Sequence, residues 1–180
     1  MNTLKEYNVA TDGAYFKTYR LVTWGAVIYD DSMLNKIHEF TNMSSDSEHI
    51  LYAQVFGELQ AVMDAINFIR ANDPIGAVIN IHYDYEGIRS WALNYWKSNN
   101  NVTTRYKLFM EELLDNPTYK VNFIKTQAHK SINKEVHDLI QVKEISPGIM
   151  EYNNELRINI TTTDPRIINF FKELPTNDLP

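Results

Sequence analysis

Cysteine is absent from the sequence, which excludes disulfide bonds and metal sites built on thiolates. No apolar run approaches the length that a membrane-spanning helix needs, so we expect no membrane partner. The first residues, Met1–Glu6, also lack the basic and then apolar pattern of a signal peptide. Together these absences predict a cytoplasmic protein.

An excess of positive charge is missing as well. The formal net charge is −6, and acidic residues outnumber basic ones both before and after residue 140. Proteins that bind nucleic acid tightly through charge are usually basic, because binding releases counterions from the phosphates. Bound metal ions reverse the charge of a carboxylate site, however, and attract phosphate themselves. The charge therefore argues against tight non-specific binding but not against metal-dependent cleavage.

The residues that are present indicate one domain of ordinary size. Of the 180 residues, 44% are hydrophobic, which is enough for a buried core. Alternating and helical apolar patterns predict an α/β fold in the order βββαβααβα, with a mixed five-stranded sheet and helices on both faces. The expected strands are residues 7–12, 22–29, 33–40, 77–84 and 119–126; the expected loop after the third strand is 41–47; the expected helices are 47–71 (interrupted near its start), 86–97, 103–114 and 133–144.

A small second unit follows this domain. Ser146–Gly148 contain a serine, a proline and a glycine in succession, the strongest boundary signal in the chain. We therefore expect a main domain at residues 1–145 and a C-terminal β/α extension at residues 146–180. Alternating apolar residues predict a strand at 155–161, and Asp164-Pro165 is typical of the start of a short helix. The pattern of this extension indicates no function.

Three carboxylates occupy informative positions. Asp12 ends the first predicted strand and Asp84 ends the fourth. Glu58 lies in the long helix, three residues after Val55 and four before Val62, so it projects close to the apolar stripe of that helix. A carboxylate facing a core is costly unless it is paired or bound to a metal ion. If the first and fourth strands are neighbours, all three carboxylates meet at one edge of the sheet.

Such a cluster would suit hard divalent ions. Oxygen ligands without thiolates favour Mg²⁺ or Mn²⁺. Two such ions about 4 Å apart, bridged by a carboxylate, are the arrangement used for in-line phosphoryl transfer. Spacing alone also allows the three acids to be unrelated, since the chain has 23 acidic residues and many lie on helices or strand ends. Asp64, for example, is expected on the solvated face of its helix.

Several stretches of the sequence add family information. They are Thr11–Tyr15 with Trp24–Ile28, Gly57–Val62, Asn80–Ile88 with the nearby Trp91-Ala92 and Trp96-Lys97, and Phe123–His129. In unbroken order over residues 7–142, they resemble type 1 ribonucleases H of the viroplasmin-related bacterial group. The resemblance implies a ribonuclease H-like fold and an endonuclease that hydrolyses the RNA strand of RNA–DNA hybrids with two divalent ions. It also leads us to expect that the small N-terminal hybrid-binding module of some relatives is missing.

The resemblance further implies roles for single residues. Asp12 matches the carboxylate that bridges both ions, and Glu58 and Asp84 match the pair that holds the ion near the leaving group. His129 matches the mobile histidine thought to assist proton transfer or product departure. The alternative for His129 is an exposed loop histidine without a role.

The fourth ligand departs from the family pattern. Relatives read Ala-His-Ser-Gly-Asp, two further residues and an asparagine, with an acidic ligand four positions later. Here the loop after His129 is two residues shorter, and the position four after Asn133 holds His137, followed by Asp138. Because one position rotates a helical side chain by about 100°, Asp138 does not simply replace the missing acid.

Three hypotheses follow for this position. In the first, His137 is a ligand through an imidazole nitrogen, which would favour Mn²⁺ over Mg²⁺. In the second, a shifted helix turns Asp138 into the site. In the third, the site has lost its activity, and the chain is a silent nucleic-acid-binding or scaffold domain whose tail after residue 147 is the functional part. A DNA resolvase or transposase-like nuclease fits less well, because such enzymes carry the third carboxylate on the closing helix.

The substrate would be recognised by its shape. An RNA–DNA hybrid presents 2′-hydroxyls in a wide, shallow minor groove, so contacts to sugars matter more than contacts to base edges. Beside the proposed ligands lie candidates for the RNA strand: Gly13, Ala14, Tyr15 and Gln60. Where relatives grip the DNA strand lie Asn94, Trp96 and Lys97, together with Trp91. One of these tryptophans is equally well explained as a core residue of an amphipathic helix.

Overall fold

The computed structural model describes residues 4–17, 20–127 and 132–140. The predicted boundary at residues 145–146, the C-terminal extension and His129 lie outside these residues. None of the helices in the described ranges is long and apolar enough to cross a membrane.

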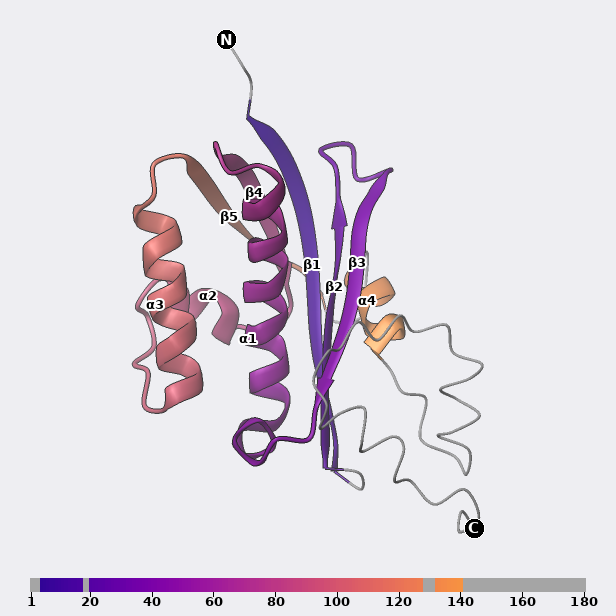
Figure 1. Cartoon of the computed structure of the whole chain (residues 1–180), viewed down its shortest axis with the longest axis vertical. Helices are drawn as coiled ribbons and strands as arrows, with labels where there is room; N and C mark the ends of the chain where they lie inside the picture. The colour runs from indigo at the N-terminus through magenta and orange to yellow at the C-terminus, as the bar shows by residue number, and fades with distance from the viewer. Residues whose placement is uncertain (1–3, 18–19, 128–131, 141–180) are drawn as a thin grey trace.

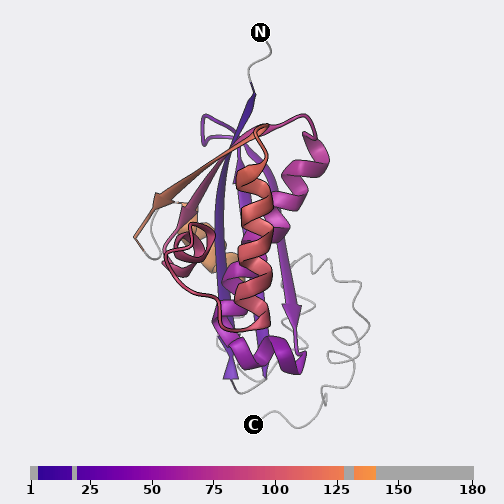
Figure 2. The same ribbon diagram turned by 90° about the vertical axis from the view of Figure 1, so that its left-hand side faces the viewer.

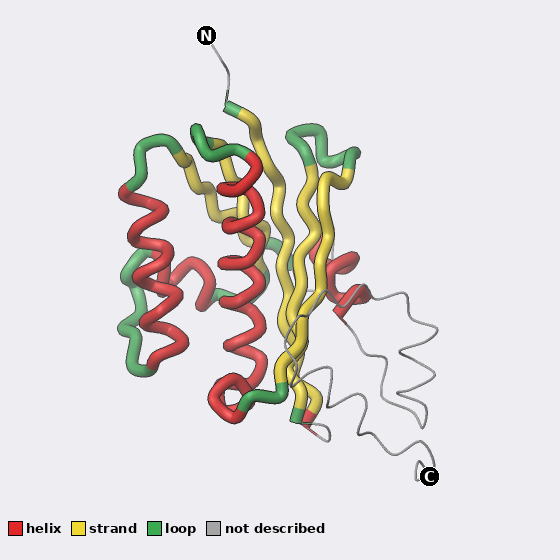
Figure 3. The backbone as a smooth tube through the Cα atoms, viewed as in Figure 1, coloured by secondary structure: helices red, strands yellow, loops and turns green. Residues whose placement is uncertain are grey.

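Five strands form one mixed sheet in the spatial order β3-β2-β1-β4-β5 (Figure 3). β1 lies at the centre, antiparallel to β2 and parallel to β4, while β3 pairs with β2 and β5 with β4. The strands are β1 (Lys5–Phe16), β2 (Leu21–Tyr29), β3 (Lys36–Ser44), β4 (Ala77–Tyr83) and β5 (Tyr119–Lys125). The predicted mixed five-stranded sheet is confirmed.

Helices cover both faces of this sheet (Figure 1). α1 runs along one face with α2 and α3 on the same side, and α4 packs against the other face. Viewed from the side of α3, the long α1 lies between that helix and the strands (Figure 2). The described helices are α1 (Ser47–Asn72), α2 (Gly87–Ala92), α3 (Asn101–Asp115) and α4 (Ile132–Ile140). Their order along the chain agrees with the predicted order.

The core is divided by β1. Val9 belongs to the large apolar cluster between the sheet and α1, which includes Leu59. Ala10 faces the opposite way, into a smaller cluster with Val136 and Ile140 of α4. Because successive side chains of a strand point to opposite faces, the same alternation directs Asp12 toward α4, two residues after Ala10.

The β2–β3 connection differs from the prediction. β3 begins at Lys36 and continues to Ser44. The expected third strand is therefore present, but the bounds 33–40 are wrong, and the strand extends into the expected loop at 41–47. The Asp30 carboxylate accepts hydrogen bonds from Ser32 Oγ and Asn35 Nδ2, which hold residues 30–35 in a turn. Asp30-Asp31-Ser32 is itself typical of a turn, but the residue types do not show that the turn extends to Asn35 before the next strand begins.

The helix predicted at 86–97 is shorter in the structure. It ends at Ala92, and Asn94 adopts a left-handed conformation with φ 62°. The backbone N–H groups of Tyr95 and Trp96 then both donate to the carbonyl of Ser90. The chain therefore folds back here instead of continuing as a helix.

Candidate active site

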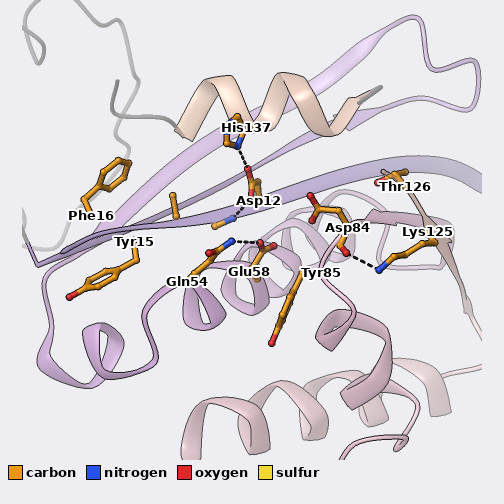
Figure 4. A pocket seen from close by; sticks show the side chains of 12 residues that line it. Asp12, Tyr15, Phe16, Gln54, Glu58, Asp84, Tyr85, Lys125, Thr126 and His137 are labelled. Carbon is orange, nitrogen blue, oxygen red and sulfur yellow. Dashed lines mark hydrogen bonds and ion pairs between the residues drawn. The ribbon is translucent and has the colours of Figure 1, made fainter. Parts of the chain in front are cut away.

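The parallel strands β1 and β4 separate close to their acidic residues. The last pair in their register is Ala10 opposite His82. Asp12 and Asp84 each lie two residues beyond this pair, so the register places them at the same level where the strands part. Ligand sites of α/β sheets commonly form beyond the carboxyl ends of parallel strands. A cavity of about 620 Å³ opens at this point (Figure 4).

A close contact between helix and strand brings Glu58 to the same cavity. Gly13 of β1 and Gly57 of α1 meet without side chains between them, and a Cβ on Gly13 would lie only 2.4 Å from the backbone nitrogen of Glu58. Only glycine permits this approach. Glu58, Asp12 and Asp84 consequently line one cavity, although they come from three different elements.

Glu58 is a buried carboxylate with an unsatisfied oxygen. Its residue is only 2% exposed. Gln54 Nε2 donates to Oε1 over 3.4 Å, while Oε2 is buried and has no hydrogen-bond partner among the described residues. Burial raises the pKa of the Glu58 carboxyl well above its ordinary value, and the charges of Asp12 and Asp84 raise it further. A proton or a cation is needed to stabilise such a group.

Asp12 is held from two sides. The backbone N–H of Gly13 donates to its Oδ1 over 2.8 Å, and His137 Nδ1 lies 2.9 Å from its Oδ2. Burial raises the pKa of the Asp12 carboxyl; the hydrogen bond and charge of His137 oppose this shift, and the charge of Asp84 adds to it. The acidic groups of the cavity therefore interact strongly with one another.

The rotation of α4 is set by Asn133. This buried side chain donates from Nδ2 to the carbonyl of His82 over 3.1 Å and accepts from Thr126 Oγ1 over 2.9 Å. His137 follows one turn later and lines the cavity. Asp138 is exposed on the outer side and pairs with the lysine one turn before it. The helix is thus not shifted in the way that the second hypothesis for this position requires.

The residues expected to contact RNA divide into two groups. Gly13, Ala14 and Tyr15 line the cavity. Gln60 does not, because its Nε2 donates to Asp64 over 2.7 Å and its Oε1 accepts from a side chain of α3. The expectation that Gln60 lies beside the ligands is therefore wrong.

Asp64 is also placed differently from the prediction. It is half-buried and accepts a hydrogen bond of 2.8 Å from Trp24 Nε1, so it does not stand on a fully solvated face. The Asp64–Trp24 bond ties α1 to β2 away from the cavity.

The residues expected near the DNA strand lie outside the cavity, after α2. Asn94 donates to Glu111 of α3 over 3.2 Å. Lys97 is exposed, and its carbonyl accepts from Trp91 Nε1. Trp96 is 42% exposed and stacks edge-on against Trp91 at 5.3 Å. Trp91 is partly buried and packs against the core, so it is the more core-like tryptophan of the pair.

Other residues of the cavity were not anticipated from the sequence. They are Phe16, Gln54, Tyr85, Lys125 and Thr126. Gln54 stands four residues before Glu58, directly after the interruption of α1 at Ala53 (φ 48°, ψ −128°), which confirms the predicted break. Lys125 Nζ donates to the Asp84 carbonyl over 2.8 Å (Figure 4). It also donates to Glu86 Oε2 over 2.9 Å. Helical spacing from Glu58 was the available signal for Gln54; Lys125 could be located only once β5 was placed beside β4.

The donor set fits divalent ions that prefer oxygen. Three carboxylates and one imidazole line the cavity, and Glu58 Oε2 is a buried acceptor that a cation would satisfy. Within the residues described, no three histidine, aspartate or glutamate side chains are placed so that together they could hold one metal ion. Mg²⁺ usually takes one or two carboxylates and completes its shell with water and substrate phosphate. The arrangement agrees with such a site.

Comparisons with known proteins identify the fold through structure and not through sequence. No protein-family model matches the chain, and a search of curated proteins gives no significant match. Solved structures do match. The N-terminal ribonuclease H domain of a Mycobacterium tuberculosis protein, fused to maltose-binding protein, gives a TM-score of 0.61 at 11% identity, over 78% of this chain and 93% of that chain.

Two further structures agree with this result. Ribonuclease H1 from the archaeon Halobacterium salinarum gives a TM-score of 0.57 at 15% identity, over 77% of this chain and 96% of that chain. LC11-RNase H1, isolated from compost by a metagenomic approach, was solved with an RNA/DNA hybrid and gives 0.61 at 15% identity, over 74% and 93%. The chain therefore has the ribonuclease H fold. Membership of the viroplasmin-related group stays a prediction.

Proposed function

We propose that this protein is an endoribonuclease that hydrolyses the RNA strand of RNA–DNA hybrids with two divalent metal ions, Mg²⁺ or Mn²⁺. The main support is the meeting of Asp12, Glu58 and Asp84 in one cavity, where a buried oxygen of Glu58 has no hydrogen-bond partner among the described residues. The complex of LC11-RNase H1 with a hybrid supports the choice of substrate, because that protein shares the fold.

The ions would be held by the four ionisable side chains of the cavity. Asp12 lies between the others and would be shared, with Glu58 and Asp84 on one side and His137 on the other. When bound, the ions would supply an activated water and neutralise charge on the phosphate and the leaving 3′ oxygen. Hydrogen bonds within the chain orient two of these carboxylates. The backbone N–H of Gly13 donates to Asp12 Oδ1, and Gln54 Nε2 donates to Glu58 Oε1.

The two strands of the hybrid would lie on different parts of the surface. The backbone around Gly13–Tyr15, beside Asp12, is suited to sugars and phosphates of the RNA strand in the minor groove. The DNA strand would lie toward Asn94, Trp96 and Lys97, where an exposed indole and an ammonium group follow α2. His129 keeps its proposed role in proton transfer or product departure.

Lys125 adds a cation to this otherwise acidic cavity. Its bonds to the Asp84 carbonyl and to Glu86 fix the ammonium group beside the end of β4. A phosphate entering the cavity would therefore meet one fixed positive side chain in addition to the bound ions.

Cleavage of a hybrid tests the proposal. RNA-labelled and DNA-labelled versions of one duplex are incubated with the protein in Mg²⁺ and, separately, in Mn²⁺, alongside Asp12→Asn and the matched control Asp138→Asn. We expect cutting of the RNA strand only, its loss in Asp12→Asn, and wild-type rates in Asp138→Asn, because Asp138 lies on the exposed side of α4.

A silent binding or scaffold domain is the second candidate. It is favoured by the histidine at the position where relatives carry an acid, one turn after Asn133. Hybrid that is bound but cut in neither metal would support this candidate and contradict the proposed nuclease.

A further inference from the structure

The cavity is chemically unsymmetrical. On the side of α1 and β4, Glu58 and Asp84 offer only oxygen atoms. On the side of α4, His137 presents an imidazole, and its Nδ1 lies 2.9 Å from Asp12 Oδ2. The two halves of the site, which share Asp12, therefore differ in the donor atoms that they offer.

The nitrogen donor is built into the fold. Val136 and Ile140, on either side of His137 in sequence, are buried against β1 and β2, and Asn133 is fixed by its two hydrogen bonds. Rotating α4 to exchange His137 for Asp138 would pull these residues out of the core. α4 thus places the imidazole of His137 in the cavity and keeps the carboxylate of Asp138, the next residue, outside it.

Imidazole and carboxylate select different ions. Mg²⁺ takes oxygen ligands and usually keeps several waters, whereas imidazole suits Fe²⁺ or Zn²⁺. Mn²⁺ also prefers oxygen, but as a transition-metal ion it accepts an imidazole nitrogen more readily than Mg²⁺ does. We infer that the site holds two unlike ions: a transition-metal ion such as Mn²⁺ beside Asp12 and His137, and Mg²⁺ on the side of Glu58 and Asp84. This inference rests on the proposed two-ion function and assigns His137 as the residue that determines metal specificity.

Pulsed electron paramagnetic resonance tests this assignment without any measurement of activity. Less than one equivalent of Mn²⁺ is added to the full chain in the presence of excess Mg²⁺. Mn²⁺ then binds only at a position that prefers it, because Mg²⁺ occupies every other metal position. Wild-type protein should bind Mn²⁺ with ¹⁴N modulation from an imidazole, and His137→Asp should lose that modulation. Asp138→Asn, a substitution on the outer face of the same helix, should give the wild-type spectrum.

Calorimetric titration gives a second readout. His137→Asp restores an all-oxygen site, so its ratio of Mn²⁺ to Mg²⁺ affinity should fall by at least about tenfold, the lower end of the losses seen when the surroundings of a metal site are altered. If His137→Asp does not fold by circular dichroism, His137→Asn replaces it, since a neutral amide oxygen also removes the nitrogen ligand. Wild-type spectra without ¹⁴N modulation, or equal ratios in wild type and variant, overturn the inference.

Failure of the inference and failure of the proposed function give different results. RNA cleavage in Mg²⁺ alone, together with Mn²⁺ spectra that lack ¹⁴N modulation, would support the nuclease and contradict the proposal of two unlike ions. Clear ¹⁴N modulation with no cleavage of any hybrid would support a metal site that uses His137 and contradict the nuclease.

Discussion

Replacing Glu58 by glutamine should stabilise the metal-free protein. The wild-type carboxylate is buried, one oxygen has a single long hydrogen bond of 3.4 Å, and the other has no partner among the described residues. A buried polar group left unsatisfied costs about 1–3 kcal/mol, more when charged, and glutamine removes the charge at nearly constant volume. We expect the free energy of unfolding to rise by about 1–3 kcal/mol. For a chain of this size that is roughly 2–12 °C in Tm.

The gain from Glu58→Gln should depend on pH. The pKa of Glu58 is raised in the folded protein, so the folded carboxyl holds its proton at pH values where the unfolded one has lost it. The free energy of unfolding of the wild type, relative to that of Glu58→Gln, is therefore greatest below the pKa that Glu58 has in the unfolded chain, about 4.3. It declines as the pH rises through the pKa that Glu58 has in the folded protein. Chemical denaturation at a series of pH values should show the two proteins converging toward acid.

Metal ions should reverse the order of stability. A ligand present at 1,000 times its Kd adds about 4.1 kcal/mol to the folded state, which exceeds the gain from the substitution, and only the wild type keeps the Glu58 ligand. Saturating Mg²⁺ or Mn²⁺ should thus make the wild type the more stable protein, whereas Asp138→Asn should follow the wild type throughout. A metal-free Glu58→Gln variant that is less stable than the wild type would refute the reasoning.

The remaining predictions concern the supports of the site. Asn133→Ala should lower the free energy of unfolding by about 1–3 kcal/mol and weaken Mn²⁺ binding, because the bonds that orient α4 are lost; unchanged Mn²⁺ affinity by titration would contradict this role. Gly13→Ala should lower the free energy of unfolding by about 1–3 kcal/mol or more, since its Cβ would lie 2.4 Å from the backbone nitrogen of Glu58. A loss of only a few tenths of a kcal/mol in thermal unfolding would show that the backbones of β1 and α1 do not approach this closely. Burial and a hydrogen bond to Asp73 raise the pKa of Tyr7 to about 12. Stability should therefore fall as the pH rises from about 10 toward 12, and Tyr7→Phe should flatten that decline in urea midpoints.

Much of the fold follows from local patterns in the sequence. The strands beginning near residues 7, 22 and 77 are apolar on one or both faces, and α1 has a regular stripe, so type and order were predicted correctly. The errors fall where side-chain hydrogen bonds decide the structure. Asp30 closes a turn that moves β3, and the carbonyl of Ser90 captures two backbone N–H groups that end α2 early.

The candidate site likewise has residues that the sequence pattern placed correctly and residues that it did not. Asp12 and Asp84 could be placed together because residues ending neighbouring parallel strands share an edge of the sheet. Gln60 was misplaced for a reason that helical geometry supplies: two residues after Glu58 it points about 200° away, whereas Gln54, four residues before, lies on the same face. The spacing from Asn133 pointed to His137, but the choice between His137 and Asp138 could not be made from the sequence, since it depends on the contacts that Asn133 makes across the fold.

Crystals grown with Mn²⁺ and a hybrid test the central claim most directly, because anomalous scattering locates the ions themselves. We predict two peaks about 4 Å apart in the cavity of Glu58 and Asp84, both in contact with Asp12, with the RNA strand beside them. No peak in this cavity at saturating Mn²⁺ would contradict the claim that these carboxylates form a two-metal nuclease site.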